Sequence, residues 1–298
     1  MHVLLTGASG FLGSSCLELL LQQPTVAITA LRSGETPIPL PFPVREVVAP
    51  RTLDYRSLAS ALVTTLPTHI IHCAAISSAE RCEQNPEAAT RANVEVTAML
   101  ARYAADIGAH LTAISTDLVF DGRKAPISGL CENDQPAPLS VYSHSKHAAE
   151  QITLNLLRSA VVRVSLLYGH SPSASKGVLG WIEKSFRERS SLTLFDDEYR
   201  TPVHVRDAAI SICEIATRSL TGIWHCGGPA RLSRVEFGRQ IAASLDYDSS
   251  LIQARSRLTH PAHPQRPEDV SLNSDKLGEA LGRSPLSVFS ALSTYVHR

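Results

Sequence analysis

A glycine-rich loop close to the N-terminus is the feature that most constrains what this chain can fold into. The apolar run Val3–Leu5 leads into the segment TGASGFLG at residues 6–13, and helical periodicity continues over Leu12–Leu21. A strand, a tight glycine turn and a helix in this order place backbone N–H groups and the positive end of a helix dipole around the phosphates of a nucleotide. We therefore predict that this loop binds a dinucleotide, through Gly7, Ser9, Gly10, Phe11, Leu12 and Gly13.

Short apolar runs alternate with amphipathic stretches through the first half of the chain. We predict strands at 26–31, 45–48, 69–73, 111–114 and 161–166, and helices at 57–66, 86–107 and 142–157. This alternation is typical of an α/β fold with a Rossmann-like, doubly wound parallel sheet of about seven strands. Asn85 and Pro86 are expected to start the helix at 86–107, as its cap and its first residue.

The alternation loosens after Tyr168, which divides the chain into two predicted parts. We expect residues 1–167 to form the dinucleotide-binding domain. Residues 168–298 would be mainly a small C-terminal substrate-binding lobe, with 203–228 returning to the first domain. Proline-rich sequence predicts two loops, one in the first part of 36–50 and one at 259–267, because proline fixes φ and removes a backbone donor.

The charge balance argues against several classes of partner. The chain has 28 basic and 28 acidic residues, so bulk charge does not draw it to nucleic acid or to an anionic membrane. No apolar run reaches the ~18–20 residues of a membrane span, and the apolar start is expected to be a buried strand rather than a leader. The six cysteines are scattered without a CxxC pair, which fits a reducing compartment. We therefore expect a cytoplasmic protein.

Two histidine pairs are the candidate metal ligands. His144 and His147 lie one turn apart on a predicted helix, and His260 and His263 lie in the second proline-rich loop. Neither pair has a cysteine or paired carboxylates nearby at ligand spacing, although Glu150 lies one turn beyond His147. We predict no metal site.

The end of the second predicted strand indicates which dinucleotide binds. Enzymes that use NAD usually place an acidic residue there, to hydrogen-bond the ribose hydroxyls. This chain has Arg32 and Ser33 instead, and both suit a 2′-phosphate. We therefore predict NADP(H) as the cofactor and keep NAD(H) as the alternative, since Arg32 could also be a solvated strand-end residue.

The segment VYSHSK at 141–146 carries the candidate chemistry. Tyr142 and Lys146 lie four residues apart on a predicted helix and therefore share one face. A neighbouring ammonium favours the phenolate form of a tyrosine, which lets the hydroxyl exchange a proton with substrate. Thr116 ends a strand whose carboxyl end faces the cofactor crevice of such a sheet, where it could donate to a substrate oxygen. A simple strand-end cap is the alternative role for Thr116.

Together these segments resemble the extended short-chain dehydrogenase/reductases. Within that family they are similar to the dTDP-4-dehydrorhamnose reductase branch, which also contains the regulatory β subunit of methionine adenosyltransferase. The combination of STD-x-VFDG with YxxxK is specific for that branch. The matching segments run along the whole chain: TGASGFLG (6–13), IIHCAA (70–75), RCEQNPEAATRANV (81–94), STDLVFDG (115–122), ENDQPAPLSVYSHSK (132–146), RVSLLYG (163–169), DDEYRTPVHVRDAA (196–209) and RPEDVSLNSDKL (266–277).

The resemblance implies a role for each matching residue. Thr116, Tyr142 and Lys146 would be the catalytic residues, with Tyr142 and Lys146 also touching the cofactor. Hydride would pass between the nicotinamide and a carbonyl or alcohol carbon. Asn93 would brace the active-site strand from within its helix, or be an ordinary polar helix residue. Further cofactor contacts would come from Asp54, Tyr55, Cys73, Ala74 and Ala75, and substrate contacts from Thr116, Asp117, Val119 and Phe120.

One segment departs from the family pattern. Rhamnose-pathway enzymes tend to carry an Asn-Phe pair shortly after the RxSxxYG segment, and residues 171–178 here contain neither. Arg200, His204 and Arg266 could bind a phosphate or carboxylate of the substrate instead, or be solvated surface residues.

Three functions therefore stay open. The first is an NADP(H)-dependent reductase of a 4-keto nucleotide-sugar or a similar carbonyl. The second is a non-catalytic NADP-binding regulatory subunit, and the third is a nucleotide-sugar epimerase or dehydratase. The expected ligand is a small molecule, phosphorylated or nucleotide-linked, and a homodimer is possible.

Overall fold

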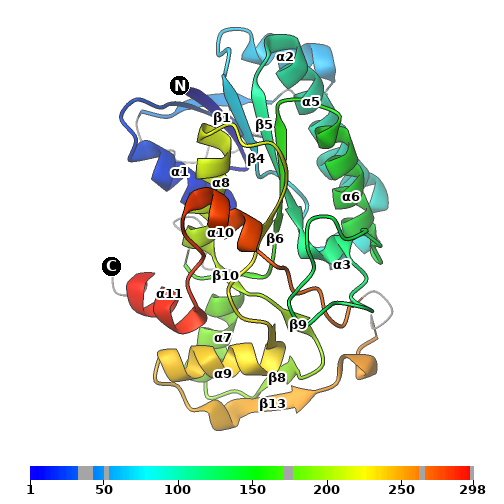
Figure 1. Cartoon of the computed structure of the whole chain (residues 1–298), viewed down its shortest axis with the longest axis vertical. Helices are drawn as coiled ribbons and strands as arrows, with labels where there is room; N and C mark the ends of the chain where they lie inside the picture. Colours follow the sequence, from blue (N-terminus) through cyan, green and yellow to red (C-terminus); the bar gives the residue numbers. More distant parts are fainter. Residues whose placement is uncertain (33–42, 50–53, 171–176, 262–265, 296–298) are drawn as a thin grey trace. The chain divides into compact units, whose positions relative to one another are not determined.

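Most strands of a seven-stranded sheet come from the first half of the chain. The computed structural model describes residues 1–32, 43–49, 54–170, 177–261 and 266–295. The sheet has the order β11-β6-β5-β4-β1-β2-β3, and the paired strands from β5 to β3 all run parallel (Figure 1). Its strands are β1 (His2–Thr6), β2 (Ala27–Arg32), β3 (Arg45–Val48), β4 (His69–His72), β5 (His110–Thr116), β6 (Ser159–Val164) and β11 (Gly222–Cys226). The predicted α/β fold with a Rossmann-like parallel sheet is confirmed.

The helices of the first half include the four predicted ones and a further helix, α3, that was not predicted. They are α1 (Phe11–Leu21), α2 (Tyr55–Leu62), α3 (Ala79–Gln84), α4 (Pro86–Thr90), α5 (Val96–Ile107) and α6 (Val141–Leu154). The helix predicted at 86–107 begins as expected, with the Asn85 side chain accepting from the Ala88 amide. A π-helical turn, η1 (Arg91–Glu95), interrupts it between α4 and α5. Sequence periodicity does not reveal such a turn, because its neighbours stay helical.

The chain separates into two compact units. Unit 1 comprises residues 1–115, 141–162 and 212–223, and unit 2 comprises 116–140, 163–211 and 224–298. This division differs from the predicted boundary at 167, because unit 2 takes in the segment that follows β5. The return to the first domain is also shorter than the predicted 203–228. A single cut along the sequence cannot reproduce units built from interleaved segments.

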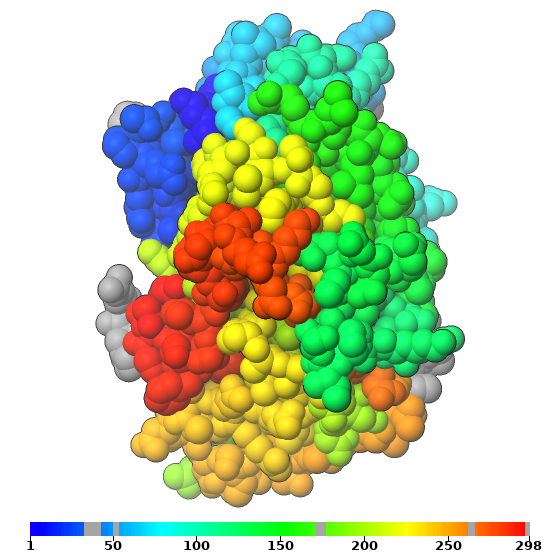
Figure 2. Space-filling view, viewed as in Figure 1, coloured from blue at the N-terminus to red at the C-terminus, as the bar shows by residue number. Residues whose placement is uncertain are grey.

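Unit 2 is built from short strands and helices. Its strands are β7 (Leu167–Tyr168), β8 (Leu192–Phe195), β9 (Tyr199–Arg200), β10 (Val203–His204), β12 (Leu232–Ser233) and β13 (Ile252–Arg255). Its helices include η2 (Asp117–Val119), α7 (Val178–Arg187), α9 (Arg234–Ser244), α10 (Asp275–Leu281) and α11 (Val288–Tyr295), while α8 (Val205–Thr217) is shared between the units. Helices α9 and α11 pack side by side, as both the ribbon and the space-filling view show (Figure 1, Figure 2). In the described part of the chain, no helix is both long and apolar enough to span a membrane.

Each unit has its own apolar core. In unit 1, α2 and α5 pack on the sheet through Leu58, Leu62 and Leu100. In unit 2, α7, α9 and α11 enclose a cluster around Tyr168 and Phe237. Residues 36–42 and 50 of the first proline-rich stretch, and residues 262–265 of the second, lie outside the described residues, so the predicted loops stay predictions there.

Candidate functional site

The glycine loop forms one wall of a cavity in unit 1. The cavity has a volume of about 410 Å³. Its lining comes from the ends of β1, β2 and β4, where parallel strands of such a sheet bind ligands. The lining residues are Thr6, Gly7, Ala8, Ser9, Gly10, Ala30, Leu31, Arg32, Glu46, Ala49, Cys73, Ala74, Ala75, Ile76, Ala92 and Val96. Of the residues predicted to bind the cofactor, Gly7, Ser9, Gly10, Arg32, Cys73, Ala74 and Ala75 belong to this cavity.

Close backbone packing explains two of the glycines. Gly7 has φ +70°, and a Cβ there would lie 2.7 Å from the Ala74 nitrogen. A Cβ on Gly13 would lie 2.1 Å from the Gly7 carbonyl oxygen, so this residue keeps α1 against the turn. Helix α1 starts behind Gly10 without a side-chain cap, which leaves its positive end directed at the loop. A cradle made of backbone, where side chains would collide, suits the pyrophosphate of a dinucleotide.

A pair of opposite charges lines the far side of this cavity. Arg32 at the end of β2 donates through Nε to Glu46 of β3 at 2.6 Å. Glu46 was not predicted as a site residue, although its strand was, because the pairing of β3 with β2 depends on contacts distant in sequence. Its carboxylate partly compensates the charge of Arg32 and could itself accept from ribose hydroxyls. Ser33, predicted beside Arg32, lies outside the described residues.

Asp54 and Tyr55 do not line this cavity, contrary to the expected adenine contact. Asp54 instead caps α2, accepting from the Ser57 amide at 2.8 Å, and this bond lowers the pKa of its carboxyl. The hydroxyl of Tyr55 bonds Asp106, and the guanidinium of Arg102 stacks 3.8 Å from its ring centroid. Both residues thus hold α2 in place.

Helix α6 carries three buried polar side chains at a spacing of four residues. Tyr142, Lys146 and Glu150 share one face and are buried, with exposed fractions of 9%, 4% and 1%. Burial lowers the pKa of the Lys146 ammonium to about 8, while the nearby Glu150 carboxylate and Cys73 oppose this shift. The structure therefore places the predicted Tyr142 and Lys146 together with an acid that was not predicted as a site residue.

Glu150 is tied to the strand that precedes Thr116. Ser115 donates through its hydroxyl to Glu150 Oε1 at 2.5 Å, and His147 Nδ1 lies 3.6 Å from Oε2. Glu150 was considered only as a metal ligand, although its position one turn beyond Lys146 is a signal that could have found it.

Asn93 lies in the π-helical turn and bridges three parts of unit 1. Its Oδ1 accepts from the Ile76 amide at 2.8 Å, and its Nδ2 donates to the Ile76 carbonyl at 3.1 Å. The same Nδ2 donates to the Ser145 hydroxyl at 2.9 Å, and Ser145 donates to the Tyr142 carbonyl at 2.7 Å. Asn93 thus joins the segment after β4 to the start of α6, and this placement favours the bracing role.

A neutral histidine extends this connection to the glycine loop. The Ala74 amide donates to Thr6 Oγ1, which lies 2.7 Å from His72 Nδ1. His72 Nε2 lies 3.0 Å from Thr97 Oγ1, and Thr97 donates to the Asn93 carbonyl. Because the Thr97 proton is used there, His72 must donate from Nε2 and accept at Nδ1. Burial, together with the positive charge of Lys146, lowers the pKa of His72 to about 3, which keeps the ring neutral.

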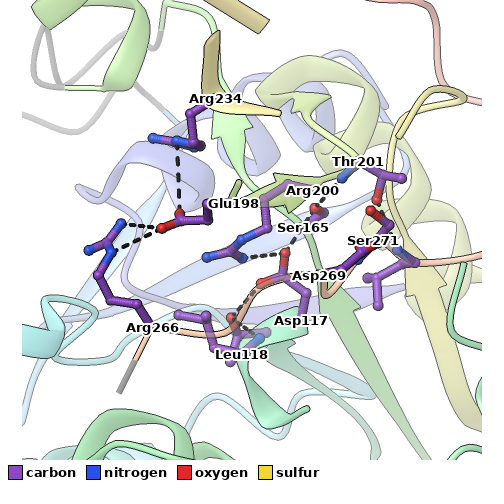
Figure 3. A network of polar contacts seen from close by, with 12 residues as sticks. Asp117, Leu118, Ser165, Glu198, Arg200, Thr201, Arg234, Arg266, Asp269 and Ser271 are labelled. Carbon is purple, nitrogen blue, oxygen red and sulfur yellow. Dashed lines mark hydrogen bonds and ion pairs between the residues drawn. The ribbon is translucent and has the colours of Figure 1, made fainter. Parts of the chain in front are cut away.

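Thr116 and Asp117 begin unit 2. Thr116 Oγ1 accepts from the Leu118 amide at 3.2 Å and lies 3.1 Å from Asp117 Oδ1, so the hydroxyl caps the η2 turn. Asp117 Oδ2 accepts from Ser165 at 2.9 Å and pairs with Arg200 Nη1 at 2.5 Å (Figure 3). Asp117 is 1% exposed and fully engaged in these contacts. Its carboxylate is therefore suited to holding Arg200 and the η2 turn rather than to touching substrate.

A second buried acid, Glu198, holds two further arginines. Arg266 donates to Glu198 Oε2 through Nη2 at 2.5 Å and through Nε at 3.0 Å, and Arg234 Nε lies 4.0 Å from Oε1 (Figure 3). Burial lowers the pKa of Arg234 to about 10; Glu198 opposes this shift, whereas the positive Arg200 and Arg266 add to it. The predicted Arg200 and Arg266 thus fall into one charged network.

Three residues predicted at the substrate site make packing contacts within unit 2. Val119 and Phe120 are buried in an apolar cluster with Leu130 and Leu272, and Phe120 makes an edge contact with His225. The ring of His204 lies between those of Tyr168 and Tyr295, and its Nδ1 accepts from the Arg206 amide. Contact of these three residues with a substrate stays a prediction. The alternation of apolar residues in a motif does not reveal which side faces ligand.

No group of metal-binding side chains occurs among the described residues. The whole chain, residues 1–298, matches the family described as the RmlD substrate binding domain. The methionine adenosyltransferase 2 subunit beta of Rattus norvegicus is 32% identical over 300 residues, which cover 96% of this chain and 85% of that protein. The probable low-salt glycan biosynthesis reductase Agl14 of Haloferax volcanii is 27% identical and covers 93% of both chains.

Solved structures show the same fold. The crystal structure of dTDP-4-dehydrorhamnose reductase from Bacillus anthracis in complex with NADP has a TM-score of 0.84 at 23% identity, and covers 99% of this chain and 98% of that one. The resemblance predicted from the motifs is confirmed. By its match over all residues and its identity to the rat protein, the chain belongs to the RmlD substrate-binding domain family.

Proposed function

We propose that this protein is an NADP(H)-dependent reductase of a carbonyl substrate in the nucleotide-sugar class. The observation that carries the proposal is the row Tyr142, Lys146 and Glu150 on one face of α6, in the same unit as a cavity suited to a dinucleotide. An enzyme of this type needs a proton donor with an adjustable charge next to its cofactor. The related Agl14 protein is described as a reductase, which agrees with this role.

Each residue of the row has a chemical task. The bound dinucleotide supplies or accepts the hydride. The Tyr142 hydroxyl donates its proton to the substrate oxygen during reduction, and the Lys146 ammonium stabilises the phenolate that remains. Glu150 keeps the buried Lys146 charged by opposing the effect of burial on its pKa. Thr116 is proposed to orient the substrate oxygen.

Unit 2 supports an anionic substrate. Arg200, Arg234 and Arg266 lie beside two buried acids, Asp117 and Glu198, and the Arg266 side chain is 32% exposed. Guanidinium groups pair readily with the oxygens of phosphates and carboxylates. These arginines would therefore suit a diphosphate or carboxylate, as in the nucleotide-linked substrates of dTDP-4-dehydrorhamnose reductases, whose fold this chain shares.

A regulatory subunit is the second candidate function. It is favoured by the several methionine adenosyltransferase 2 beta subunits among the relatives, at up to 32% identity. Such a subunit would need the dinucleotide cavity but no turnover.

The two functions are separated by NADPH oxidation. The purified protein is assayed against a panel of 4-keto nucleotide-sugars and simple ketones, beside its Tyr142→Phe variant. Turnover that disappears in the variant while NADPH still binds would establish the reductase. NADPH binding with no turnover on any carbonyl, followed by a change in the activity of an added methionine adenosyltransferase, would establish the regulatory subunit instead.

A further inference from the structure

A continuous series of hydrogen bonds runs through unit 1 from the glycine loop to the start of α6. At its first end the Ala74 amide donates to Thr6 Oγ1 at 3.2 Å, and the Gly7 turn packs on the same Ala74. Thr6 Oγ1 lies 2.7 Å from His72 Nδ1, and His72 Nε2 lies 3.0 Å from Thr97 Oγ1. The series therefore starts at backbone that lines the dinucleotide cavity.

The other end of the series is the residue that carries the candidate chemistry. Thr97 donates to the Asn93 carbonyl at 2.7 Å, and the Asn93 side-chain amide donates to the Ser145 hydroxyl at 2.9 Å. Ser145 donates in turn to the Tyr142 carbonyl at 2.7 Å. His72 connects the two ends, because each of its ring nitrogens faces one of them.

The donors of this series all point in one direction. Thr97 uses its proton on Asn93, so His72 donates to Thr97 from Nε2 and accepts from Thr6 at Nδ1. From the Ala74 amide to the Tyr142 carbonyl, each donor thus points from the glycine loop towards α6. Hydrogen bonds in such a chain polarise and strengthen one another.

Burial makes each of these bonds important. The five side chains of the series are between 0% and 6% exposed: Thr6, His72, Asn93, Thr97 and Ser145. A buried polar group that loses its partner is costly. A change in one member therefore obliges its neighbours either to move or to lose a bond.

We propose that His72 is a positioning residue that couples the glycine loop to the start of α6. The affinity for the dinucleotide and the placement of Tyr142 then depend on the same series of hydrogen bonds. The effect is reciprocal, because a coupling free energy acts equally in both directions. The proposal rests on the dinucleotide binding of the proposed function, but not on turnover or on the identity of a substrate.

The first test removes a hydroxyl that does not line the cavity. Thr97→Val deletes the acceptor of His72 with little change in size. The matched control is Thr29→Val, because Thr29 is equally buried and lies 2.9 Å from the ring of another histidine, His2, outside the series. We expect the Kd of NADPH to rise about 3–10-fold in Thr97→Val, as for one lost hydrogen bond, and to stay at the wild-type value in Thr29→Val.

Fluorescence titration of NADPH measures both variants. An unchanged Kd in Thr97→Val would overturn the proposal. An equal rise in Thr29→Val would also do so, because it would show that any buried threonine of unit 1 has this effect.

The second test addresses the ring itself. His72→Phe keeps a planar ring without either bond, whereas His72→Gln offers an acceptor and a donor on one amide group. We expect His72→Gln to retain more NADPH affinity than His72→Phe. A His72→Phe variant that binds NADPH as tightly as wild type would contradict the proposal.

Nitrogen NMR of the wild-type protein adds a measurement that needs no nucleotide and no variant. At neutral pH the His72 ring should be uncharged, with its proton on Nε2. An imidazolium, or a proton on Nδ1, would break the series at His72 and overturn the assignment.

A double-mutant cycle tests the connection to α6. Ser145→Ala removes the bond from Asn93 near the far end of the series. Independent substitutions multiply their effects on a dissociation constant, whereas substitutions within one network do not. We expect Thr97→Val and Ser145→Ala together to raise the Kd of NADPH by less than the product of their separate factors. An effect equal to that product would show that the two ends are not coupled.

These measurements are made without a substrate, which separates the proposal from the reductase function. Coupled effects on NADPH binding in a protein that turns over no carbonyl would contradict the reductase and support the role of His72. Turnover with uncoupled effects would have the opposite meaning.

Discussion

The two functional regions of this molecule use charge in opposite ways. In unit 1 the dinucleotide cavity is made mostly of backbone and small residues, and the elements around it are joined by neutral hydrogen bonds through His72, Asn93 and Ser145. In unit 2 the network around Asp117 and Glu198 consists of buried ion pairs. We therefore expect single substitutions in unit 1 mainly to lower turnover, and those in unit 2 mainly to lower the free energy of unfolding.

The largest expected effect is on chemistry in unit 1. Tyr142→Phe removes the proton donor and should lower kcat by about 10²–10⁴-fold, the usual contribution of general acid catalysis. NADPH affinity and the free energy of unfolding should stay close to wild type, because the hydroxyl is a small part of the buried side chain. Steady-state kinetics and denaturant unfolding check both. A large loss of stability with full turnover would contradict the expected difference between the two units.

Asp117→Asn should mainly destabilise the protein. It leaves Arg200 buried without its acid, which typically costs about 3–5 kcal/mol. The matched control is Asp121→Asn, whose Arg123 partner is largely exposed, and which should cost less than about 1 kcal/mol. Urea unfolding of both variants gives the comparison. A similar small effect for the two would show that the ion pair in unit 2 does not depend on burial.

Glu150→Gln should shift a pH profile. Losing the carboxylate removes an interaction that raises the pKa of Lys146, so that pKa should fall below about 8, by roughly one unit. Turnover that needs the ammonium should then decline at lower pH than in wild type. Measurement of kcat/KM from pH 6 to 10 checks this, with the exposed Glu95→Gln as control. A profile that keeps its midpoint would mean that Glu150 acts only through packing.

The same lysine gives unit 1 one pH-dependent contribution to stability. Its folded pKa of about 8 lies below the ordinary 10.5, so between these values the unfolded chain binds more protons. The free energy of unfolding should therefore rise with pH across this window in wild type. Lys146→Met should remove that rise, which unfolding titrations at pH 7.5 and 10 can measure.

The smallest effect concerns cofactor choice. Glu46→Gln releases Arg32 from a partly exposed ion pair, and should increase the preference for NADPH over NADH by about 0.5–1 kcal/mol. Arg32→Glu should shift the preference the other way by about 1–3 kcal/mol. Fluorescence titrations with both nucleotides test this pair. An unchanged preference for NADPH over NADH in both variants would show that neither charge interacts with the 2′-position of the ribose.

Features encoded locally were predictable from sequence. The glycine loop and the cap at Asn85 depend on neighbouring residues, and the parallel sheet follows from short-range alternation of apolar runs. Tyr142 and Lys146 were predicted to share one face for the same reason, since residues four apart on a helix lie on one side. Glu150 obeys the same spacing and could have been included.

Features that depend on distant contacts were not predictable. The role of Asp117 is set by Arg200 and Ser165, and that of His204 by Tyr295. Phe120 was predicted to bind substrate from the family resemblance, and its burial in an apolar cluster depends on Leu130 and Leu272, which lie further along the chain. Polar or apolar character alone does not say whether a side chain faces a ligand or a neighbour.

The π-helical turn around Asn93 makes the number of residues in this helix important. A π turn accommodates one residue more than an α-helix does, and each residue of an α-helix advances its face by about 100°. Deleting Ala92 could relax the turn to regular helix, which is locally favourable. The amide of Asn93 would then rotate away from Ile76 and Ser145. The π turn therefore acts as a spacer, although its geometry is less favourable than that of an α-helix. A shorter, regular helix would lose the hydrogen bonds through which Asn93 holds the start of α6.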